Sequence, residues 1–305
     1  MKQPLTGIIP PMLTPLRGID ELDGDGLAKL TEHILAGGVH GLFILGTTGE
    51  GPSLGYRLRR ELIERVCRQV QGRVPVLVGI TDTAFVESVA LARQAADAGA
   101  DAVVLAPPYY MPEGQPELRE YLAHLLPELP RPLFLYNMPP LTKVPFELET
   151  VRWALDQPRI AGMKDSSGNM TYFNQALGLA RQRPDWTLLT GPEELLAESV
   201  LMGGHGGVNG GANIFPALYV ATFEAARSGD LIRARELQRR IQSVVDKLYR
   251  VGQHPSAVIK GIKCAASCLG LCSDFMAEPF HRFRDPERRR IEEGMAELRA
   301  IVAWK

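Results

Sequence analysis

A lysine stands where a short apolar run of the sequence ends. Segment 160–168 reads IAGMKDSSG, so Lys164 directly follows Ile160, Ala161 and Met163 and precedes a cluster of turn-forming residues. A lysine amine in water is almost entirely protonated at neutral pH. Burial at the mouth of an apolar sheet disfavours the charged form, and a neutral amine can attack a ketone to form a Schiff base. Such an adduct allows the adjacent carbon–carbon bond to be split or formed.

Hydroxyl groups and glycine-rich backbone follow other apolar runs. Thr47 and Thr48 lie in GTTGE at 46–50, and Tyr136 is the next-to-last residue of the run PLFLYN at 132–137. A phenol can transfer protons, and threonine hydroxyls with neighbouring amides can bind a carboxylate without adding a cation. There is no HExxH motif and no carboxylate cluster with metal-ligand spacing. The set therefore favours amine catalysis on a carbonyl substrate.

Each of these features by itself also has a simpler structural interpretation. A lysine after a strand is usually a solvated rim residue, and Tyr136 fits a core tyrosine with a wet hydroxyl. GTTGEG fits a turn in which Thr48 caps a helix, and Glu50 and Asp165 fit acceptors for backbone amides. The catalytic interpretation depends on all of them lying at one end of a single architecture.

Short apolar runs alternate with segments of helical period. The runs are rich in Val, Ile and Leu and do not alternate with polar residues, as expected for parallel strands buried on both faces. They occupy 7–15, 41–50, 74–82, 100–110, 132–140, 160–168, 186–194 and 206–215. Helices are predicted at 25–38, 57–72, 86–100, 117–129, 171–183 and 193–204.

Eight such units predict an α/β fold, a (β/α)8 TIM barrel whose active site forms at the C-terminal ends of the strands. An open doubly wound sheet is the alternative, although no GxGxxG follows the first strand. After Ile214 the chain is predicted to be helical, at 215–230, 231–252, 256–270 and 286–305. We therefore expect a barrel catalytic domain at 1–224 and a C-terminal helical region at 225–305.

Composition sets the class of protein. The 305 residues carry a net charge of -1, with 45% hydrophobic and 23% charged residues. Nothing indicates a basic nucleic-acid footprint or membrane-facing surface. No apolar run reaches the roughly 18 residues of a membrane span, and the opening lacks the apolar segment of a signal peptide. We expect a cytoplasmic protein with no nucleic-acid or membrane partner.

Three cysteines near the C-terminus have helical spacing. Cys264, Cys268 and Cys272 are four residues apart, which predicts that they stack along one helix face. A metal site would need a fourth ligand, for which His281 is the nearby candidate. Buried structural thiols are the favoured interpretation, since free cysteine packs like a small hydrophobe.

Five motifs, in order along nearly the whole chain, resemble those of one superfamily. They are GTTGE at 46–50, PPYY at 107–110, LYNMP at 135–139, KDSSG at 164–168 and GGHGGVNGGAN at 203–213. The sequence is similar to the dihydrodipicolinate synthase and N-acetylneuraminate lyase superfamily. The resemblance implies a (β/α)8 barrel with helical C-terminal region, a keto acid and an aldehyde as substrates, and no metal or organic cofactor. It also implies a homotetramer built as a dimer of tight dimers.

The resemblance implies roles for the matching residues. Lys164 corresponds to the Schiff-base lysine, and Tyr136 to the tyrosine that relays protons and touches the substrate carboxylate. Thr47, Thr48 and the amide of Gly49 correspond to the loop that binds the pyruvate carboxylate.

Further positions match the superfamily with more variation. Tyr110 corresponds to the tyrosine that, in the synthase branch, reaches into the neighbouring subunit's site, and Tyr109 is a less secure substitute. Val208 corresponds to the residue whose backbone carbonyl lies near the lysine. Asn209 and Gly210 replace the small hydroxyl or aliphatic residues of the synthases and are expected to leave room for a longer polyol tail.

One departure bears on the reaction. True dihydrodipicolinate synthases carry an arginine after the YN-x-P motif for the aldehyde's carboxylate, and Leu141 stands there in this chain. Leucine makes no charge-assisted hydrogen bond, and the nearby Lys143 lacks the bidentate fork of arginine. The sequence therefore favours an aldolase or lyase acting on a 2-keto acid, such as a 2-keto-3-deoxy sugar acid. The alternatives are dihydrodipicolinate synthase, which condenses pyruvate with aspartate semialdehyde, and a non-catalytic keto-acid-binding barrel.

Overall fold

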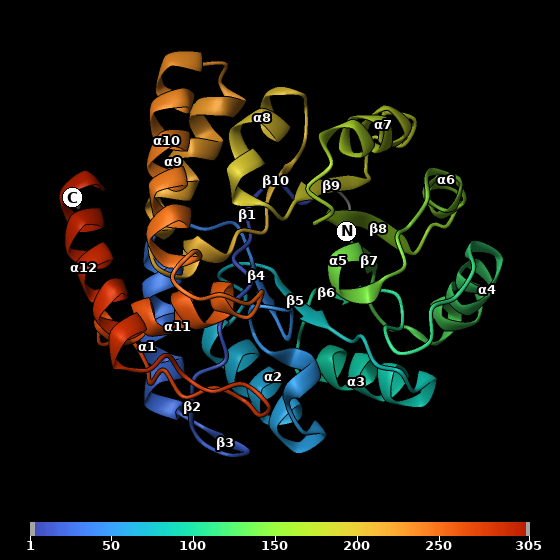
Figure 1. Cartoon of the computed structure of the whole chain (residues 1–305). Helices are drawn as coiled ribbons and strands as arrows, with labels where there is room; N and C mark the ends of the chain where they lie inside the picture. The colour runs from blue at the N-terminus through green and yellow to red at the C-terminus, as the bar shows by residue number, and fades with distance from the viewer. Residues whose placement is uncertain (1–3, 303–305) are drawn as a thin grey trace.

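Eight parallel strands form the centre of the protein, in a computed structural model that describes residues 4–302 (Figure 1). Their hydrogen-bonded order is β1, β10, β9, β8, β7, β6, β5 and β4. The bounds are β1 Gly7–Ile8, β4 Leu42–Ile44, β5 Val76–Gly79, β6 Ala102–Leu105, β7 Leu133–Asn137, β8 Ile160–Asp165, β9 Thr187–Thr190 and β10 Gly206–Gly207. The predicted α/β class is confirmed.

The two ends of this sheet meet, which closes it into a barrel. Pro11, just beyond β1, forms a parallel bridge with Phe43 on β4. The Met12 amide donates to the Phe43 carbonyl at 2.8 Å, and the Phe43 amide donates to the Pro10 carbonyl at 3.0 Å. Closure removes the free edges that an open sheet would have, so the predicted (β/α)8 barrel is confirmed and the doubly wound alternative is wrong.

Side chains of each strand alternate between two apolar layers. On β6, Ala102 and Val104 join a cluster inside the barrel, whereas Val103 and Leu105 join the larger core between strands and helices. This period of two is the geometry of a β-strand. Because both faces are buried, the strands are mostly apolar, and the polar residues of β7 and β8 lie at their carboxyl ends.

Helices surround the strands on all sides in Figure 1. They are α1 Gly24–Ala36, α2 Tyr56–Val70, α3 Phe85–Asp97, α4 Gln115–Leu125, α6 Leu148–Leu155, α7 Met170–Ala180, α8 Leu196–Leu201 and α9 Pro216–Arg227. Each predicted helix is present with ends shifted by a few residues. The sequence did not predict α6, the one-turn helix α5 Pro139–Thr142, or the antiparallel hairpin of β2 Leu16–Gly18 and β3 Glu21–Leu22.

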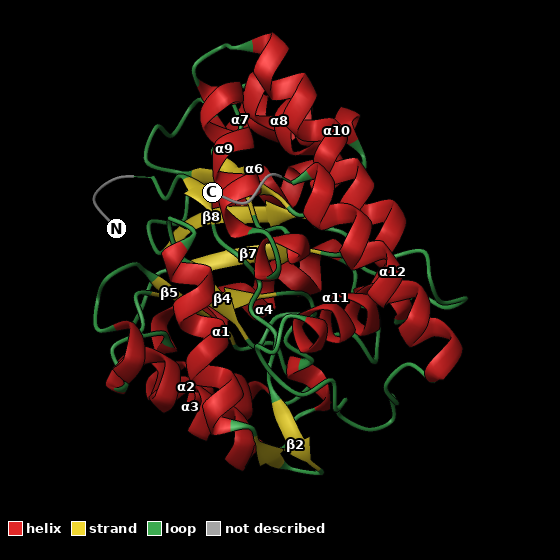
Figure 2. Ribbon diagram, turned by 90° about the vertical axis from the view of Figure 1, so that its left-hand side faces the viewer, coloured by secondary structure: helices red, strands yellow, loops and turns green. Residues whose placement is uncertain are grey.

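The C-terminal region consists of three helices on one side of the barrel. These are α10 Leu231–Leu248, α11 Ala257–Cys268 and α12 Asp285–Ile301, and Figure 2 shows them gathered along one flank. The predicted boundary at 224/225 falls inside α9 and stays a prediction. No helix within residues 4–302 is long and apolar enough to cross a membrane.

The cysteines do not share one helix face as expected. Cys264 and Cys268 lie on α11, but this helix ends at Cys268, and Gly270 turns the chain with a φ of 70°. Cys272 therefore lies beyond the helix. Across the described part of the chain, no three His, Cys, Asp or Glu side chains are grouped so that they could hold a metal ion.

Candidate active site

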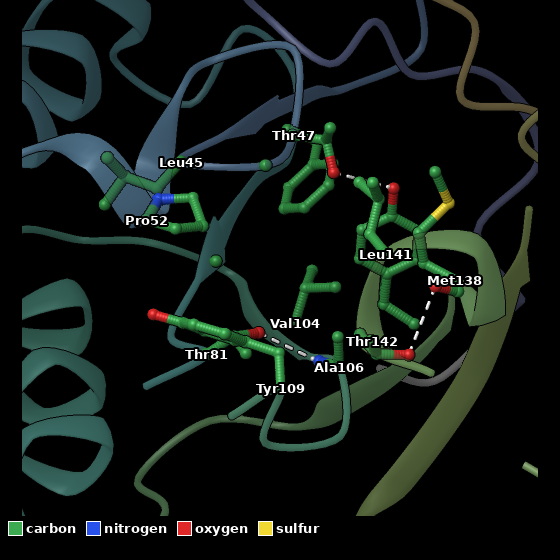
Figure 3. A pocket seen from close by; sticks show the side chains of 14 residues that line it. Leu45, Thr47, Pro52, Thr81, Val104, Ala106, Tyr109, Met138, Leu141 and Thr142 are labelled. Carbon is green, nitrogen blue, oxygen red and sulfur yellow. Dashed lines mark hydrogen bonds between the residues drawn. The ribbon is translucent and has the colours of Figure 1, made fainter. Parts of the chain in front are cut away.

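The carboxyl ends of β4 to β7 enclose a cavity of about 180 Å³ (Figure 3). Its wall is largely apolar, with hydroxyl groups from threonine and tyrosine. The lining residues are Phe43, Leu45, Gly46, Thr47, Pro52, Gly79, Thr81, Val104, Ala106, Tyr109, Tyr136, Met138, Leu141 and Thr142. None of these fourteen residues is charged. Two of the hydroxyls already bond to the backbone, because Thr81 accepts from the Ala106 amide and Thr142 donates to backbone carbonyls.

Lys164 lies beside this cavity with its side chain buried. The register of β7 and β8 pairs Lys164 with Tyr136, and the lysine Nζ lies 4.0 Å from the centroid of that tyrosine ring. The same nitrogen is 5.3 Å from the centroid of the Phe43 ring. Only 6% of Lys164 is exposed, and no ion pair among residues 4–302 includes it. The amine therefore has an apolar, aromatic environment without a carboxylate partner among the described residues.

The phenol of Tyr136 connects the lysine strand to the GTTGE loop. Its oxygen is 3.1 Å from the hydroxyl oxygen of Thr47, and either group can donate the hydrogen bond. The ring of Phe43 packs edge-on to Tyr136, with centroids 6.3 Å apart and an interplanar angle of 90°. The orientation of the Tyr136 ring, between Lys164 and Thr47, is thus fixed by packing as well as by hydrogen bonding.

Loop 45–51 folds back on itself directly after β4. Two residues other than glycine adopt left-handed backbone conformations, Leu45 with a φ of 60° and Glu50 with a φ of 55°. Thr14 donates a hydrogen bond to the Gly49 carbonyl at 2.6 Å, and a Cβ on Gly51 would lie only 2.2 Å from the Leu45 carbonyl oxygen. Backbone held in such sparsely populated conformations is frequent at functional sites.

The simpler interpretation of this loop is only partly right. Thr48 is half-buried and is not the cap of the short 3₁₀ turn Gly51–Ser53, which is preceded by Glu50 without a side-chain cap bond. The Glu50 carboxylate does accept from a backbone amide, that of Ala277, but it also pairs with Lys263. This ion pair was not predicted.

Asp165 follows Lys164 and serves the neighbouring loop. Its carboxylate accepts hydrogen bonds from the Asn137 side chain at 2.8 Å and from the amide and hydroxyl of Ser167 at 3.1 and 3.0 Å. Burial raises the pKa of Asp165, although these three donors favour the charged form. The residue thus holds the ends of β7 and β8 together.

Val208 and Asn209 follow β10 and take different positions. Val208 packs in the inner cluster that also contains Tyr136 and Phe43. The Asn209 side chain is fully buried and donates to the Gly191 carbonyl at 2.9 Å, which joins the ends of β9 and β10. Neither residue is among those that line the cavity.

The two tyrosines of the PPYY motif point to different places. Tyr109 lines the cavity, whereas Tyr110 is 83% exposed and lies outside it. The adjacent Met111 is 70% exposed. Within one chain, therefore, Tyr109 rather than Tyr110 contributes to the wall.

The cavity wall has a leucine where the synthases are expected to have arginine. Leu141 lines the cavity on the one-turn helix α5. Lys143 does not line it, and its ammonium donates instead to the Pro140 carbonyl at 2.9 Å. The described wall of the cavity therefore lacks a cation at this position.

Sequence reasoning missed several wall residues. Thr81 follows β5 in the segment GITD and lines the cavity. Thr47 and Tyr136 were predicted as site residues because they lie at the ends of apolar runs, and the same criterion would have selected Thr81. Met138 and Thr142 depend on α5, which has no periodic signal because it is a single turn.

Comparison with known proteins places the whole chain in one family. Residues 4–298 match the Dihydrodipicolinate synthetase family. The structure of dihydrodipicolinate synthase from Bacteroides thetaiotaomicron is 55% identical, with a TM-score of 0.94 over 97% of this chain and 100% of that chain. YagE, a prophage protein of the dihydrodipicolinic acid synthase family from Escherichia coli K12 solved in complex with pyruvate, is 28% identical, with a TM-score of 0.90 over 96% of this chain and 98% of that chain.

A relative with another reaction in its name is also similar. The probable 2-dehydro-3-deoxy-D-pentonate aldolase YjhH of Escherichia coli is 32% identical over 87% of this chain and 88% of that protein. The names of the relatives thus give more than one reaction. The chain belongs to the Dihydrodipicolinate synthetase family and is a lyase of the class I, pyruvate-dependent aldolase type.

Proposed function

We propose that the protein forms or splits the carbon–carbon bond between pyruvate and an aldehyde through a Schiff base on Lys164. The observation that carries this proposal is the buried Lys164 amine, 4.0 Å from the ring of Tyr136, whose phenol meets the hydroxyl of Thr47. An amine in such an environment can act as a nucleophile once it is uncharged.

Each residue of the site has its own role in the proposed reaction. The Lys164 nitrogen attacks the keto carbon of pyruvate, and loss of water gives an iminium ion. Removal of a methyl proton gives an enamine, which attacks the aldehyde carbon, and water then releases the longer 2-keto acid. Tyr136 relays the protons, and Thr47 with Thr48 and the Gly49 amide binds the pyruvate carboxylate. These steps need no metal or organic cofactor.

Borohydride trapping tests this assignment. Reduction in the presence of pyruvate should add one reduced, pyruvate-derived group to the peptide that contains Lys164, because borohydride converts an iminium ion to a stable amine. A Lys164→Arg variant is the control and should take no label. An unlabelled Lys164 peptide in the parent protein would overturn the proposal. Pyruvate binding without exchange of its methyl protons would indicate a non-catalytic keto-acid-binding barrel.

We propose that the substrate is a 2-keto acid whose aldehyde part is not anionic, such as a 2-keto-3-deoxy sugar acid. Leu141 in the cavity wall supports it, since a buried carboxylate without a cation is costly. Dihydrodipicolinate synthase activity is the second candidate, because the 55% identical Bacteroides protein carries that name. Cleavage assays with 2-keto-3-deoxy acids, run beside condensation of pyruvate with aspartate semialdehyde, separate the two.

A further inference from the structure

The loop assigned to the substrate carboxylate is attached to the C-terminal region by an ion pair at its end. The Lys263 Nζ on α11 lies 2.5 Å from the Glu50 Oε1, and both side chains are 0% exposed. The second oxygen of Glu50 accepts from the Ala277 amide at 2.8 Å. The two partners are 213 and 227 residues away along the chain, so only tertiary folding brings them to the loop.

The backbone of Glu50 gives this contact a local consequence. Glu50 directly follows Thr47, Thr48 and Gly49 and adopts a left-handed φ of 55°, a strained conformation for a residue with a side chain. Such a conformation persists only where the surroundings hold it. The two bonds to the Glu50 carboxylate are the contacts that fix the side chain from outside the barrel.

We propose that Lys263 is a positioning residue, which holds loop 46–50 in the conformation that binds the keto-acid carboxylate through its ion pair with Glu50. The identity of the ligand in this proposal rests on the proposed function. The effect of Lys263 on the order of the loop does not depend on that function. Without Lys263 the Glu50 carboxylate stays buried with one amide donor, which favours movement of the loop. A displacement of about 1 Å at a group that binds the substrate is enough to lower the reaction rate strongly.

Lys263→Met is the direct test, because methionine keeps most of the length of the side chain and removes its charge. We expect the KM for pyruvate to rise by about tenfold or more, with a smaller change in kcat, because the loss lies in carboxylate binding. Hydrogen exchange of peptides that cover 46–53 should become faster, while exchange across β7 stays unchanged.

The double variant Lys263→Met with Glu50→Gln separates positioning from general damage. Glutamine keeps an acceptor for the Ala277 amide and leaves no unpaired charge, so the pyruvate KM should recover in part, but not to the parent value because the link to α11 is still missing. If Lys263→Met does not fold, hydrogen exchange is measured instead in this double variant and in Glu50→Gln alone. Exchange at 46–53 should be faster in Glu50→Gln alone.

Lys247→Met is the matched control. Lys247 forms a 2.5 Å ion pair with Glu297 between α10 and α12, but those side chains are 40% and 55% exposed, so neither pyruvate KM nor loop exchange should change. Unchanged loop exchange, or a pyruvate KM within twofold of the parent, in Lys263→Met would overturn the proposal. If the parent takes no pyruvate label, the proposed function fails, while faster loop exchange still supports the role of Lys263.

Discussion

Leu141 gives the cavity wall an apolar side chain where the family resemblance predicts an arginine in the synthases. It lines the cavity at a position where charge would be needed for an anionic aldehyde, and Lys143 is bonded elsewhere. We propose that this side chain determines whether the wall accepts an anionic aldehyde.

Leu141→Arg should increase kcat/KM for aspartate semialdehyde by about tenfold or more, since a hydrogen bond to a charged group contributes roughly 1.5–3 kcal/mol. Steady-state kinetics with pyruvate saturating is the measurement. Leu141→Gln, with similar size and no charge, is the control and should bring little gain. An equal gain with glutamine would show that charge is not the determinant.

At the scale of elements, one buried carboxyl joins the end of β9 to the helices outside the barrel. Glu193 accepts hydrogen bonds from the hydroxyls of Tyr219 on α9 and Tyr249 after α10, and from the Gly211 amide at 3.0 Å. Burial raises the pKa of Glu193 from 4.5 to about 7, although these donors favour the carboxylate. Ionisation of this group is thus coupled to packing of the loop after β10.

This raised pKa predicts a pH-dependent stability. Between pH 4.5 and 7 the folded protein keeps a proton on Glu193 that the unfolded chain releases. The contribution of Glu193 to the stability of the folded state is therefore full below pH 4.5 and is lost as the pH rises through 7. The free energy of unfolding should fall by at most about 1.4 kcal/mol per pH unit relative to Glu193→Gln. Urea unfolding of both proteins at pH 5, 6 and 7 measures this difference. Parallel pH profiles would contradict the assignment.

At the scale of the whole molecule, Tyr110 lies at the surface of its own chain. It is 83% exposed beside the exposed Met111, whereas its neighbour Tyr109 lines the cavity of its own chain. Large exposed aromatic and apolar side chains that are adjacent favour a contact with another protein surface. We propose that Tyr110 completes the site of a neighbouring copy in a homotetramer.

Tyr110→Phe should then lower kcat/KM by about tenfold or more while the fold and the oligomeric state are kept, because only the phenol is lost. Activity assays combined with light scattering test this, and Tyr121→Phe, on α4, is the control. Activity per chain should also fall on dilution below the dissociation constant of the assembly. Fully active monomers would rule the shared site out.

Much of the site could be predicted from residues at the ends of apolar runs. Lys164, Tyr136 and Thr47 were nominated because parallel strands of a barrel present their carboxyl ends together, and the structure brings these three side chains into contact. Asn209, predicted as a substrate-binding residue, is buried between strand ends and is not among the residues that line the cavity, so its role stays a prediction. A loop has no periodicity, so its sequence does not say which way a side chain points.

The sequence by itself determined the alternation of buried strands and helices, the eight units of the barrel and the amine at the end of one strand. These follow from local periodicity and from a topology that has few alternatives. Only the tertiary structure decided that Lys143 bonds to a carbonyl, that Tyr110 lies outside its own cavity, and that Glu50 pairs with Lys263. Such contacts join residues far apart in the chain, and their energies depend on burial, which no local pattern of residues contains.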